Sequence, residues 1–417
     1  MTPRFYLLKD RPHPGPLPQE RGTPWCTLGI FERNSTNPAL GSRKGLKWSL
    51  LLLGEKAGMR AVVLTISFCL LFCGTAALHA ETNTLPWLKV NEDGTGFVES
   101  DTGKKFIPWG FNYDRDYKKR LLEDYWAEDW QTVVQDFREM KGLGANVVRI
   151  HLQFGKFMTS ADKPNRNALK KLQQLLRLAE ETGLYLDLTG LGCYRKSDTP
   201  KWYGKLDESA RWQAQANFWS AIDEECKDSP AVFCYDLINE PFVGQKRKEG
   251  DWLAGELGGF YYLQAITLDY GKRNPDEVAG EWAEKLKNAI RKQDSRHLIT
   301  LGMLPISSRG FVKAVSPHLD FMCVHEYPKG GKIAESVERL KKFSVGKPLV
   351  IEETFPLSCN AQELGQFIKQ SSPTACGWIG FYWGQTPEEL ARERGIAASI
   401  TRNWLDLFQK INPNGRR

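Results

Sequence analysis

The chain has 417 residues, 41% of them hydrophobic and 26% charged, a composition typical of a folded globular protein. Its net charge of +7 lies almost entirely in residues 1–80, which hold 10 Lys and Arg against 4 Asp and Glu. The rest of the chain is close to neutral. The overall basicity therefore gives no reason to expect binding to nucleic acid or to anionic membranes.

The first 80 residues differ from the rest in composition. Residues 1–58 are basic and rich in proline. We expect either that they form a disordered extension or that translation starts at Met59 and they are not part of the protein. Residues 59–80 give a basic start, an apolar stretch and small residues, the pattern of a secretory signal peptide. An uncleaved anchor helix is the alternative. We predict a secreted or periplasmic protein.

Residues 85–412 predict one domain that opens with a short β-hairpin, because apolar segments alternate with turn residues between 88 and 103. Buried strands follow, with helical patterns between them. The predicted strands are 106–112, 146–151, 184–189, 232–238, 298–302, 321–324, 349–352 and 378–383. The clearest helical patterns cover 130–140, 167–182, 208–227, 276–292 and 333–343.

This alternation predicts a (β/α)8 TIM barrel rather than an open doubly wound sheet. The first strand ends in Gly110-Phe111-Asn112-Tyr113, which lacks the glycine-rich turn of a nucleotide site. The segment 242–276 is interpreted as a long loop after the fourth strand. No linker divides the domain, so we expect no appended module.

Cysteine usage gives no sign of a metal site. Six cysteines follow residue 80, and none of their spacings resembles a metal-ligand pattern. Cys234 and Cys323 lie inside apolar strands, where buried free thiols are expected.

Two predicted strands end in glutamate. Asn239-Glu240-Pro241 closes the apolar run 231–238, and the run 348–351 leads into Glu352-Glu353. Two carboxyl groups at one face of a barrel are what glycoside hydrolysis requires, one as proton donor and one ionised. Because successive strand residues face opposite sides, only one of Glu352 and Glu353 is expected to reach the barrel mouth. Periodicity does not decide which.

From 85 to 408 the chain resembles glycoside hydrolase family 5, in the barrel clan with catalytic glutamates on strands four and seven. Each motif alone is weak, but their order and their places at strand ends are specific. The residues that carry the resemblance are Arg149, Asn239-Glu240-Pro241, His325-Glu326-Tyr327, Glu353 and Trp383. The resemblance implies that Glu240 is the acid/base and that Glu353, rather than Glu352, is the nucleophile.

The resemblance also implies supporting roles. Asn239 would bind the sugar 2-hydroxyl, and Tyr327 would donate a hydrogen bond to the nucleophile. His325, two residues before Tyr327, would point to the same side of the strand as Tyr327. Arg149 would supply compensating charge, within hydrogen-bond reach of Glu353 or Asn239. Trp383 would form the platform beneath the sugar.

Three of these residues also have structural interpretations. Arg149 could be an ion-pair member of the barrel, His325 could be satisfied by packing, and Trp383 could belong to the core. The sequence departs from the family at Thr189, where a histidine is common, which affects the expected substrate preference.

These observations predict a retaining β-glycoside hydrolase of endo-glucanase or mannanase type, acting on β-linked glucan or mannan. Its carboxyl groups should stand about 5–5.5 Å apart. We expect no cofactor, no metal, no nucleic acid, no stable membrane partner and a monomer. The alternatives are a non-catalytic carbohydrate-binding barrel and a transglycosylase that uses the same acids. An aldolase-like barrel would need a lysine at a strand end, and none of the predicted strands closes on one.

Overall fold

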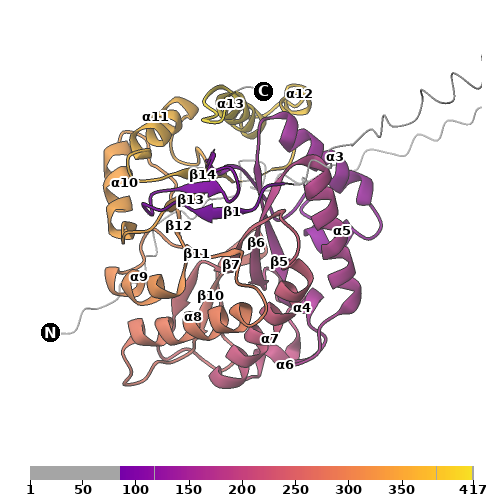
Figure 1. Ribbon diagram of the computed structural model, residues 1–417, viewed down its shortest axis with the longest axis vertical. Coiled ribbons are helices and arrows are strands. Elements are labelled where there is room, and N and C mark those ends of the chain that lie inside the picture. The colour runs from indigo at the N-terminus through magenta and orange to yellow at the C-terminus, as the bar shows by residue number, and fades with distance from the viewer. Residues whose placement is uncertain (1–84, 117, 382, 416–417) are drawn as a thin grey trace, which may run out of the picture. The chain divides into compact units, whose positions relative to one another are not determined.

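The computed structural model describes residues 85–116, 118–381 and 383–415, so the expected extension at 1–58 and signal peptide at 59–80 lie outside the described part. Eight parallel strands close into a barrel, which confirms the predicted fold class (Figure 1). In barrel order they are β4 (Trp109–Tyr113), β5 (Val147–Gln153), β6 (Tyr185–Gly192), β7 (Val232–Asn239), β11 (Leu298–Met303), β12 (Met322–His325), β13 (Leu349–Thr354) and β14 (Gly377–Gly380).

Helices surround the barrel in the ring seen in Figure 1. The longer ones are α3 (Trp130–Gly142), α5 (Arg166–Thr182), α7 (Glu208–Cys226), α8 (Pro275–Arg291), α9 (Arg309–Val315), α10 (Ile333–Leu340), α11 (Ala361–Ser371) and α13 (Ile396–Lys410). Short helical turns are α2 (Leu122–Tyr125), α4 (Phe154–Phe157), α6 (Lys201–Gly204), α12 (Pro387–Leu390), η2 (Ser316–His318) and η3 (Lys341–Phe343). Within the described residues, no helix combines the length and apolarity needed to cross a bilayer.

Local sequence explains where several of these helices begin and end. The side chains of Asn165, Asp207, Asn274 and Asn360 accept hydrogen bonds from backbone N–H groups in the first turn of α5, α7, α8 and α11. Gly183 ends α5 in the left-handed region, with φ of 68°.

The first predicted strand, 106–112, divides in the structure. Lys105–Phe106 is strand β3 of the N-terminal sheet, whereas the barrel strand starts at Trp109. Pro108 stands between them, and a proline has no N–H to continue a ladder. The chain can therefore leave one sheet and enter the other at this point.

The N-terminal sheet seals one end of the barrel. It consists of β1 (Leu88–Val90), β2 (Phe97–Glu99) and β3, all antiparallel. Phe97 enters the barrel and meets Phe233 and Phe321 edge-on, with ring centroids 5.1 and 5.0 Å away. This end of the interior is apolar and closed, so the opposite end, where the strands terminate, is left for chemistry.

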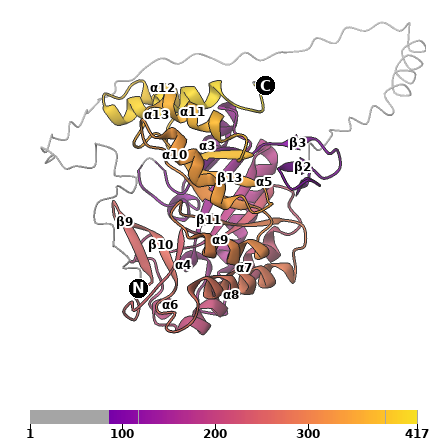
Figure 2. The same ribbon diagram turned by 90° about the vertical axis from the view of Figure 1, so that its left-hand side faces the viewer.

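The segment 242–276, expected to be a loop, carries a second small sheet. Its strands are β8 (Pro241–Val243), β9 (Leu253–Leu257) and β10 (Phe260–Thr267). β10 pairs in parallel with β8 and antiparallel with β9. Figure 2 shows β9 and β10 at the far end of the barrel from β2 and β3. The sheet follows directly after Glu240 and stands beside the barrel mouth.

We predict that Phe97→Ala lowers the free energy of unfolding by about 3–5 kcal/mol, because it empties the aromatic seal inside the barrel. Urea unfolding followed by tryptophan fluorescence would measure the loss. Lys89→Ala, an exposed position on β1 of the same sheet, is the control and should change little. Equal stability of Phe97→Ala and the parent would show that the sheet does not support the barrel.

Candidate active site

Polar side chains gather where the barrel strands end. Arg149 comes from β5, Asn239 and Glu240 from the end of β7, His325 from β12 and Glu353 from β13. All are buried: Arg149 and His325 are fully inaccessible, and Glu240 and Glu353 are each 6% exposed. The structure therefore brings together five of the seven residues that the sequence selected, and Tyr327 joins them through Glu353.

Glu240 and Glu353 face each other across a shared histidine. A carboxylate oxygen of each lies within 4.8 Å of the other and of a ring nitrogen of His325. His325 Nδ1 is 2.9 Å from Glu240 Oε1 and 3.5 Å from Glu353 Oε1. The spacing is compatible with the carboxyl separation of about 5–5.5 Å found in retaining glycosidases.

Arg149 is the centre of the hydrogen-bond network. Its Nη1 donates to Glu353 Oε1 at 2.6 Å and to Asn112 Oδ1 at 2.9 Å. Its Nη2 donates to Asp236 Oδ2 at 2.7 Å and to Asn239 Oδ1 at 3.0 Å. The expected contacts of Arg149 with Glu353 and Asn239 are both confirmed. One guanidinium thereby ties residues from β4, β7 and β13 to β5.

Opposing influences act on the Glu353 carboxyl. Burial and the nearby Glu240 raise its pKa, whereas His325, Arg149 and the hydrogen bond from Tyr327 lower it; the net shift is upward. Tyr327 donates its hydroxyl proton to Glu353 Oε2 at 2.6 Å. Each of these donors favours the ionised carboxylate against the cost of burial.

His325 is held as a cation. Burial alone would lower its pKa, but the negative charge of Glu353 and hydrogen bonds to Glu240 and Glu352 raise it to about 10. The imidazolium therefore carries a positive charge between the carboxylates at neutral pH. A second histidine, His151, behaves oppositely: burial and the charge of Arg149 lower its pKa well below the ordinary value.

The backbone at Glu240 is unusual for a residue with a side chain. Its φ is 45°, in the left-handed region. The ladder between β7 and β11 shifts register just before this point, yet Glu240 N–H still donates to the carbonyl of Gly302 at 2.9 Å. Such conformations cost free energy and gather at functional sites. Here the turn aims the carboxyl into the barrel mouth.

The expectation that Glu352 and Glu353 face opposite sides is wrong, because the β13 ladders shift register between Ile351 and Thr354. Both side chains point inward. Glu352 is fully buried, and its Oε2 lies 3.2 Å from His325 Nε2 and 3.5 Å from Arg149 Nη2. Glu353 is the one that opens to the mouth. Strict alternation fails where a ladder shifts.

The side chain of Trp383 contacts residues of α3 and β4. Its ring is 1% exposed, its Nε1 donates to Asp136 Oδ1 on α3 at 3.1 Å, and it packs against Phe111. This is the core position that the sequence allowed as an alternative. The sugar-platform role requires an exposed ring face and stays a prediction.

Several site residues were not selected from the sequence. Asn112 is the last residue of β4 that points into the barrel, and its Oδ1 lies 3.1 Å from His151 Nε2. The Nδ1 atom of His151 contacts the hydroxyl of Tyr194. Period-two spacing from Arg149 to His151 was the available signal. Asp187 and Asp236 interrupt apolar strands, which is itself a signal because charge inside a strand is costly.

Thr189, at the position where the family commonly has histidine, donates to Asp236 Oδ2 at 2.8 Å. It therefore serves the network around Arg149.

Two groups of described residues place carboxylate or imidazole atoms within 4.8 Å of one another, as a metal site would: Glu240-His325-Glu353 and Asp187-Asp236-Glu352. In the first group, His325 already contacts both carboxylates through one nitrogen. The absence of a metal from the reaction stays a prediction. All six cysteines among the described residues are free thiols, as expected for Cys234 and Cys323.

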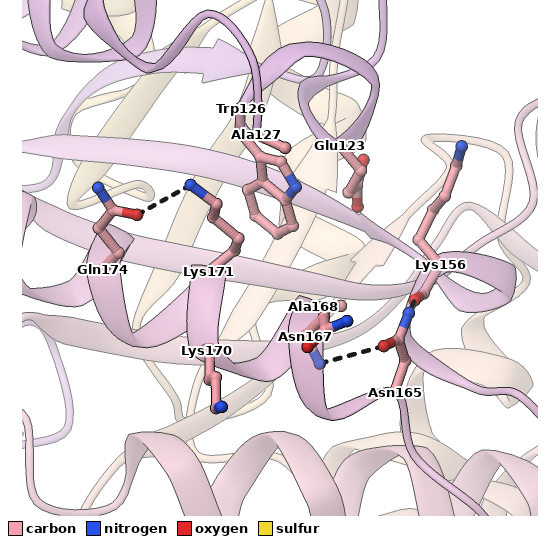
Figure 3. A pocket seen from close by; sticks show the side chains of 10 residues that line it. All are labelled: Glu123, Trp126, Ala127, Lys156, Asn165, Asn167, Ala168, Lys170, Lys171 and Gln174. Carbon is pink, nitrogen blue, oxygen red and sulfur yellow. Dashed lines mark hydrogen bonds between the residues drawn. The ribbon is translucent and has the colours of Figure 1, made fainter.

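A separate pocket of about 440 Å³ lies on the outer ring between α2 and α5 (Figure 3). Glu123 and Trp126 border it on one side, and Lys170 and Lys171 of α5 on the other. Burial raises the pKa of Glu123 to about 7. None of the residues that line this pocket belongs to the carboxylate network, so it is no part of the candidate active site.

The family model for cellulase (glycosyl hydrolase family 5) matches residues 101–378, well over half of the chain. The chain belongs to glycosyl hydrolase family 5. Mannan endo-1,4-beta-mannosidase A of Podospora anserina is 25% identical over 278 residues, covering 58% of this chain and 60% of that protein. The chain thus spans about three fifths of the length of this curated relative.

Solved structures of the same architecture support the fold. The exo-beta-1,4-mannosidase Op5Man5 from Opitutaceae bacterium strain TAV5 superposes with a TM-score of 0.56 at 17% identity, over 77% of this chain and 61% of that one. The beta-1,4-mannanase from the sea hare Aplysia kurodai gives a TM-score of 0.52 at 14% identity, over 79% and 98%. At these identities the likeness concerns the fold alone.

We predict that Tyr327→Phe moves the acid limb of the kcat/KM profile to higher pH. The variant loses a donor that favours ionised Glu353, so the pKa of Glu353 rises further and more of the enzyme is protonated at low pH. A hydrogen bond to a charged group corresponds to a rate loss of about ten- to a hundredfold. A pH profile on a soluble β-glycan or an aryl glycoside would measure both effects.

The matched control is Tyr185→Phe, which removes a hydroxyl that donates to Pro86 O at 2.7 Å. It should leave the acid limb in place. An unmoved limb in Tyr327→Phe would contradict a role of Tyr327 in setting the Glu353 charge.

Proposed function

We propose that this family 5 protein is a secreted retaining β-glycoside hydrolase that cleaves β-linked glucan or mannan by double displacement. The observation that carries the proposal is the close approach of Glu240 and Glu353, whose carboxylate oxygens lie within 4.8 Å of each other at the barrel mouth. This separation is nearer to the carboxyl spacing of about 5–5.5 Å in retaining enzymes than to the spacing of about 6.5–9.5 Å in inverting enzymes.

The surroundings of the two glutamates differ, and the difference supports distinct roles. Glu353 receives hydrogen bonds from Arg149 and Tyr327 and lies near His325, whereas His325 is the one side-chain partner of Glu240 among the described residues. The group with more donors is better stabilised as an anion. We therefore propose that Glu353 is the carboxyl that stays ionised. This assigns Glu353 as nucleophile and Glu240 as acid/base.

The reaction follows in two balanced steps. Ionised Glu353 attacks the anomeric carbon while the bond from that carbon to the leaving oxygen breaks, and Glu240 gives its proton to that oxygen. The product is a glycosyl ester of Glu353. Glu240, now ionised, takes a proton from water as the water attacks the anomeric carbon, which releases the sugar and restores Glu353.

Two hydrogen bonds hold the Asn239 side chain in a position to orient the sugar whose glycosidic bond is cleaved. Its Oδ1 accepts from Arg149 and its Nδ2 donates to the carbonyl of Tyr262 at 3.0 Å, so the side-chain amide has one fixed orientation. We propose that it contacts the 2-hydroxyl, where hydrogen bonds strengthen in the transition state. Trp383 remains our proposed platform, and this requires its buried ring to become exposed when substrate binds.

The names of the relatives favour mannan as the first substrate to test, since the matches include a mannan endo-1,4-beta-mannosidase and a beta-1,4-mannanase. We propose endo action by a monomer without cofactor or metal. We also propose export directed by residues 59–80, which N-terminal sequencing of the exported protein would test.

We predict that Glu353→Ala loses turnover on natural glycans by several orders of magnitude, because no covalent intermediate can form. Added azide should restore cleavage of an activated aryl glycoside and give a glycosyl azide of inverted configuration, identified by NMR. Glu352→Ala is the matched control, since azide should not rescue it. Rescue of Glu352→Ala in place of Glu353→Ala would show that Glu352 is the nucleophile.

Hydrolysis itself is tested with mannan, a soluble cellulose derivative, xyloglucan and mixed-linkage glucan, by measuring new reducing ends. We predict release from mannan or a β-glucan. Glu240→Ala should lose activity on these polymers but keep attack on substrates whose leaving groups need no proton. Binding without release would indicate a non-catalytic barrel, and transfer to an added acceptor sugar in place of hydrolysis would indicate a transglycosylase.

A further inference from the structure

A layer of three acids lies inside the barrel beneath the proposed catalytic glutamates. Asp187 of β6, Asp236 of β7 and Glu352 of β13 are all fully buried. One carboxylate oxygen from each lies within 4.8 Å of the others. Three carboxyl groups so close together, without access to water, cannot all be ionised unless cations compensate them.

The hydrogen bonds of this layer are unevenly distributed. Asp236 is fully engaged, because it accepts from Arg149 at 2.7 Å, from Thr189 at 2.8 Å and from the backbone N–H of Gly302 at 2.8 Å. Glu352 accepts from His325 through Oε2, while no described residue donates to its Oε1. Neither oxygen of Asp187 receives an N–H or O–H donor from the described part of the chain.

The surroundings of Asp187 are poor in positive charge. Arg149 is the one cation among the groups that act most strongly on it, and that guanidinium also serves Asp236, Glu353 and Glu352. An ionised Asp187 would be a buried charge without a donor, which is strongly unfavourable. The groups that face this carboxyl are Arg149 from β5, Cys234 and Asp236 from β7, Cys323 from β12 and Glu352 from β13.

A proton on Asp187 removes the difficulty, because a neutral carboxylic acid becomes a donor. Burial and the charges of Glu352 and Asp236 raise the pKa of Asp187 well above its ordinary value, and Arg149 only partly opposes them. The pKa of Glu352 falls to about 2, since Arg149, His325 and Asp187 stabilise its anion against the cost of burial. The pKa of Asp187 is thus raised and that of Glu352 lowered, so a proton between them resides on Asp187.

We propose that Asp187 is a neutral acid that donates its proton to Glu352, and that this pair anchors the His325 cation beneath Glu240 and Glu353. Asp187 and Glu352 act through His325 and are positioning residues. With Nε2 held from below by Glu352, the ring of His325 keeps Nδ1 turned toward both upper carboxylates. The inference uses the proposed function only for the roles of Glu240 and Glu353.

The rival interpretation is a cation bound among the three acids, with Asp187 ionised. The two interpretations make opposite predictions for Asp187→Asn. An asparagine can still donate to Glu352. If Asp187 is protonated and neutral, the substitution removes no charge, so the environment of His325 is unchanged. If Asp187 were ionised, the same substitution would delete a negative charge near the histidine and bring its pKa down.

The test is an NMR titration of the full-length protein labelled in its histidine rings, with the His325 signal assigned by its absence in His325→Gln. No substrate is needed, so a failed titration leaves the proposed hydrolysis untouched, and a failed hydrolysis assay leaves this result intact. In Glu352→Gln the midpoint of His325 should fall by about one to two pH units, the effect of one adjacent charge. In Asp187→Asn it should stay at the parent value.

A stability measurement gives an independent readout with a fixed sign. An acid that must stay protonated makes the folded state less stable as pH rises from its unfolded pKa toward its raised folded pKa. Asp187→Asn has no such loss, so its stability relative to the parent should increase from mildly acidic to mildly alkaline pH. Asp223→Asn on α7 is the matched control: Asp223 is also buried with its pKa raised, to about 8.

Asp223→Asn should reproduce the pH-dependent gain in stability while leaving His325 unaffected. A lower His325 midpoint in Asp187→Asn, or a relative stability that decreases with pH, would overturn the proposal. So would a stoichiometric metal ion in the purified protein that Asp187→Asn loses.

Discussion

A single buried guanidinium determines the arrangement of the barrel mouth. Arg149 holds Asn112, Asp236, Asn239 and Glu353 at once. Asn112 lies on the neighbouring strand β4, whereas the other three come from β7 and β13, which do not pair with β5 in the barrel. Carboxylates packed this tightly repel one another unless a cation with several donors in a rigid plane lies between them. Folding therefore assembles the site and satisfies the charge in the same event, and a partly closed barrel would leave Arg149 buried without its partners.

The interior is divided so that this polar cluster can be tolerated. At the N-terminal end, Phe97, Phe233 and Phe321 form an apolar seal, and a continuous hydrophobic shell separates the strands from the helices. Burial of that apolar surface supplies the stability that offsets desolvated charge above it. The apolar seal leaves the other end of the described barrel, where the strands terminate, for Glu240 and Glu353.

Much of this could be predicted from the sequence. Apolar runs separated by helical patterns gave eight strands, and a carboxylate closing a run marked the strand end at Glu240. The errors arose where local rules give way to pairing between strands. The β13 ladders shift register, so Glu352 and Glu353 both face inward, and no pattern within a single strand reveals a shift imposed by its neighbours. The sequence pattern at Trp383 fits a core residue and a sugar platform equally well, because the partner of its indole N–H, Asp136 on α3, lies far away in the sequence.

The position of His325 between Glu240 and Glu353 is set one layer below them. Both carboxylates approach the same nitrogen of His325, and the ring can serve both only if its other nitrogen is fixed. Glu352 fixes it, and Glu352 can do so as an anion because Asp187 shares its charge through a proton. Of the two carboxylates, Glu353 also receives hydrogen bonds from Arg149 and Tyr327, and our proposed assignment of nucleophile and acid depends on this difference. In this way Asp187 and Glu352, which are buried below the proposed catalytic glutamates, contribute to the chemistry at the barrel mouth.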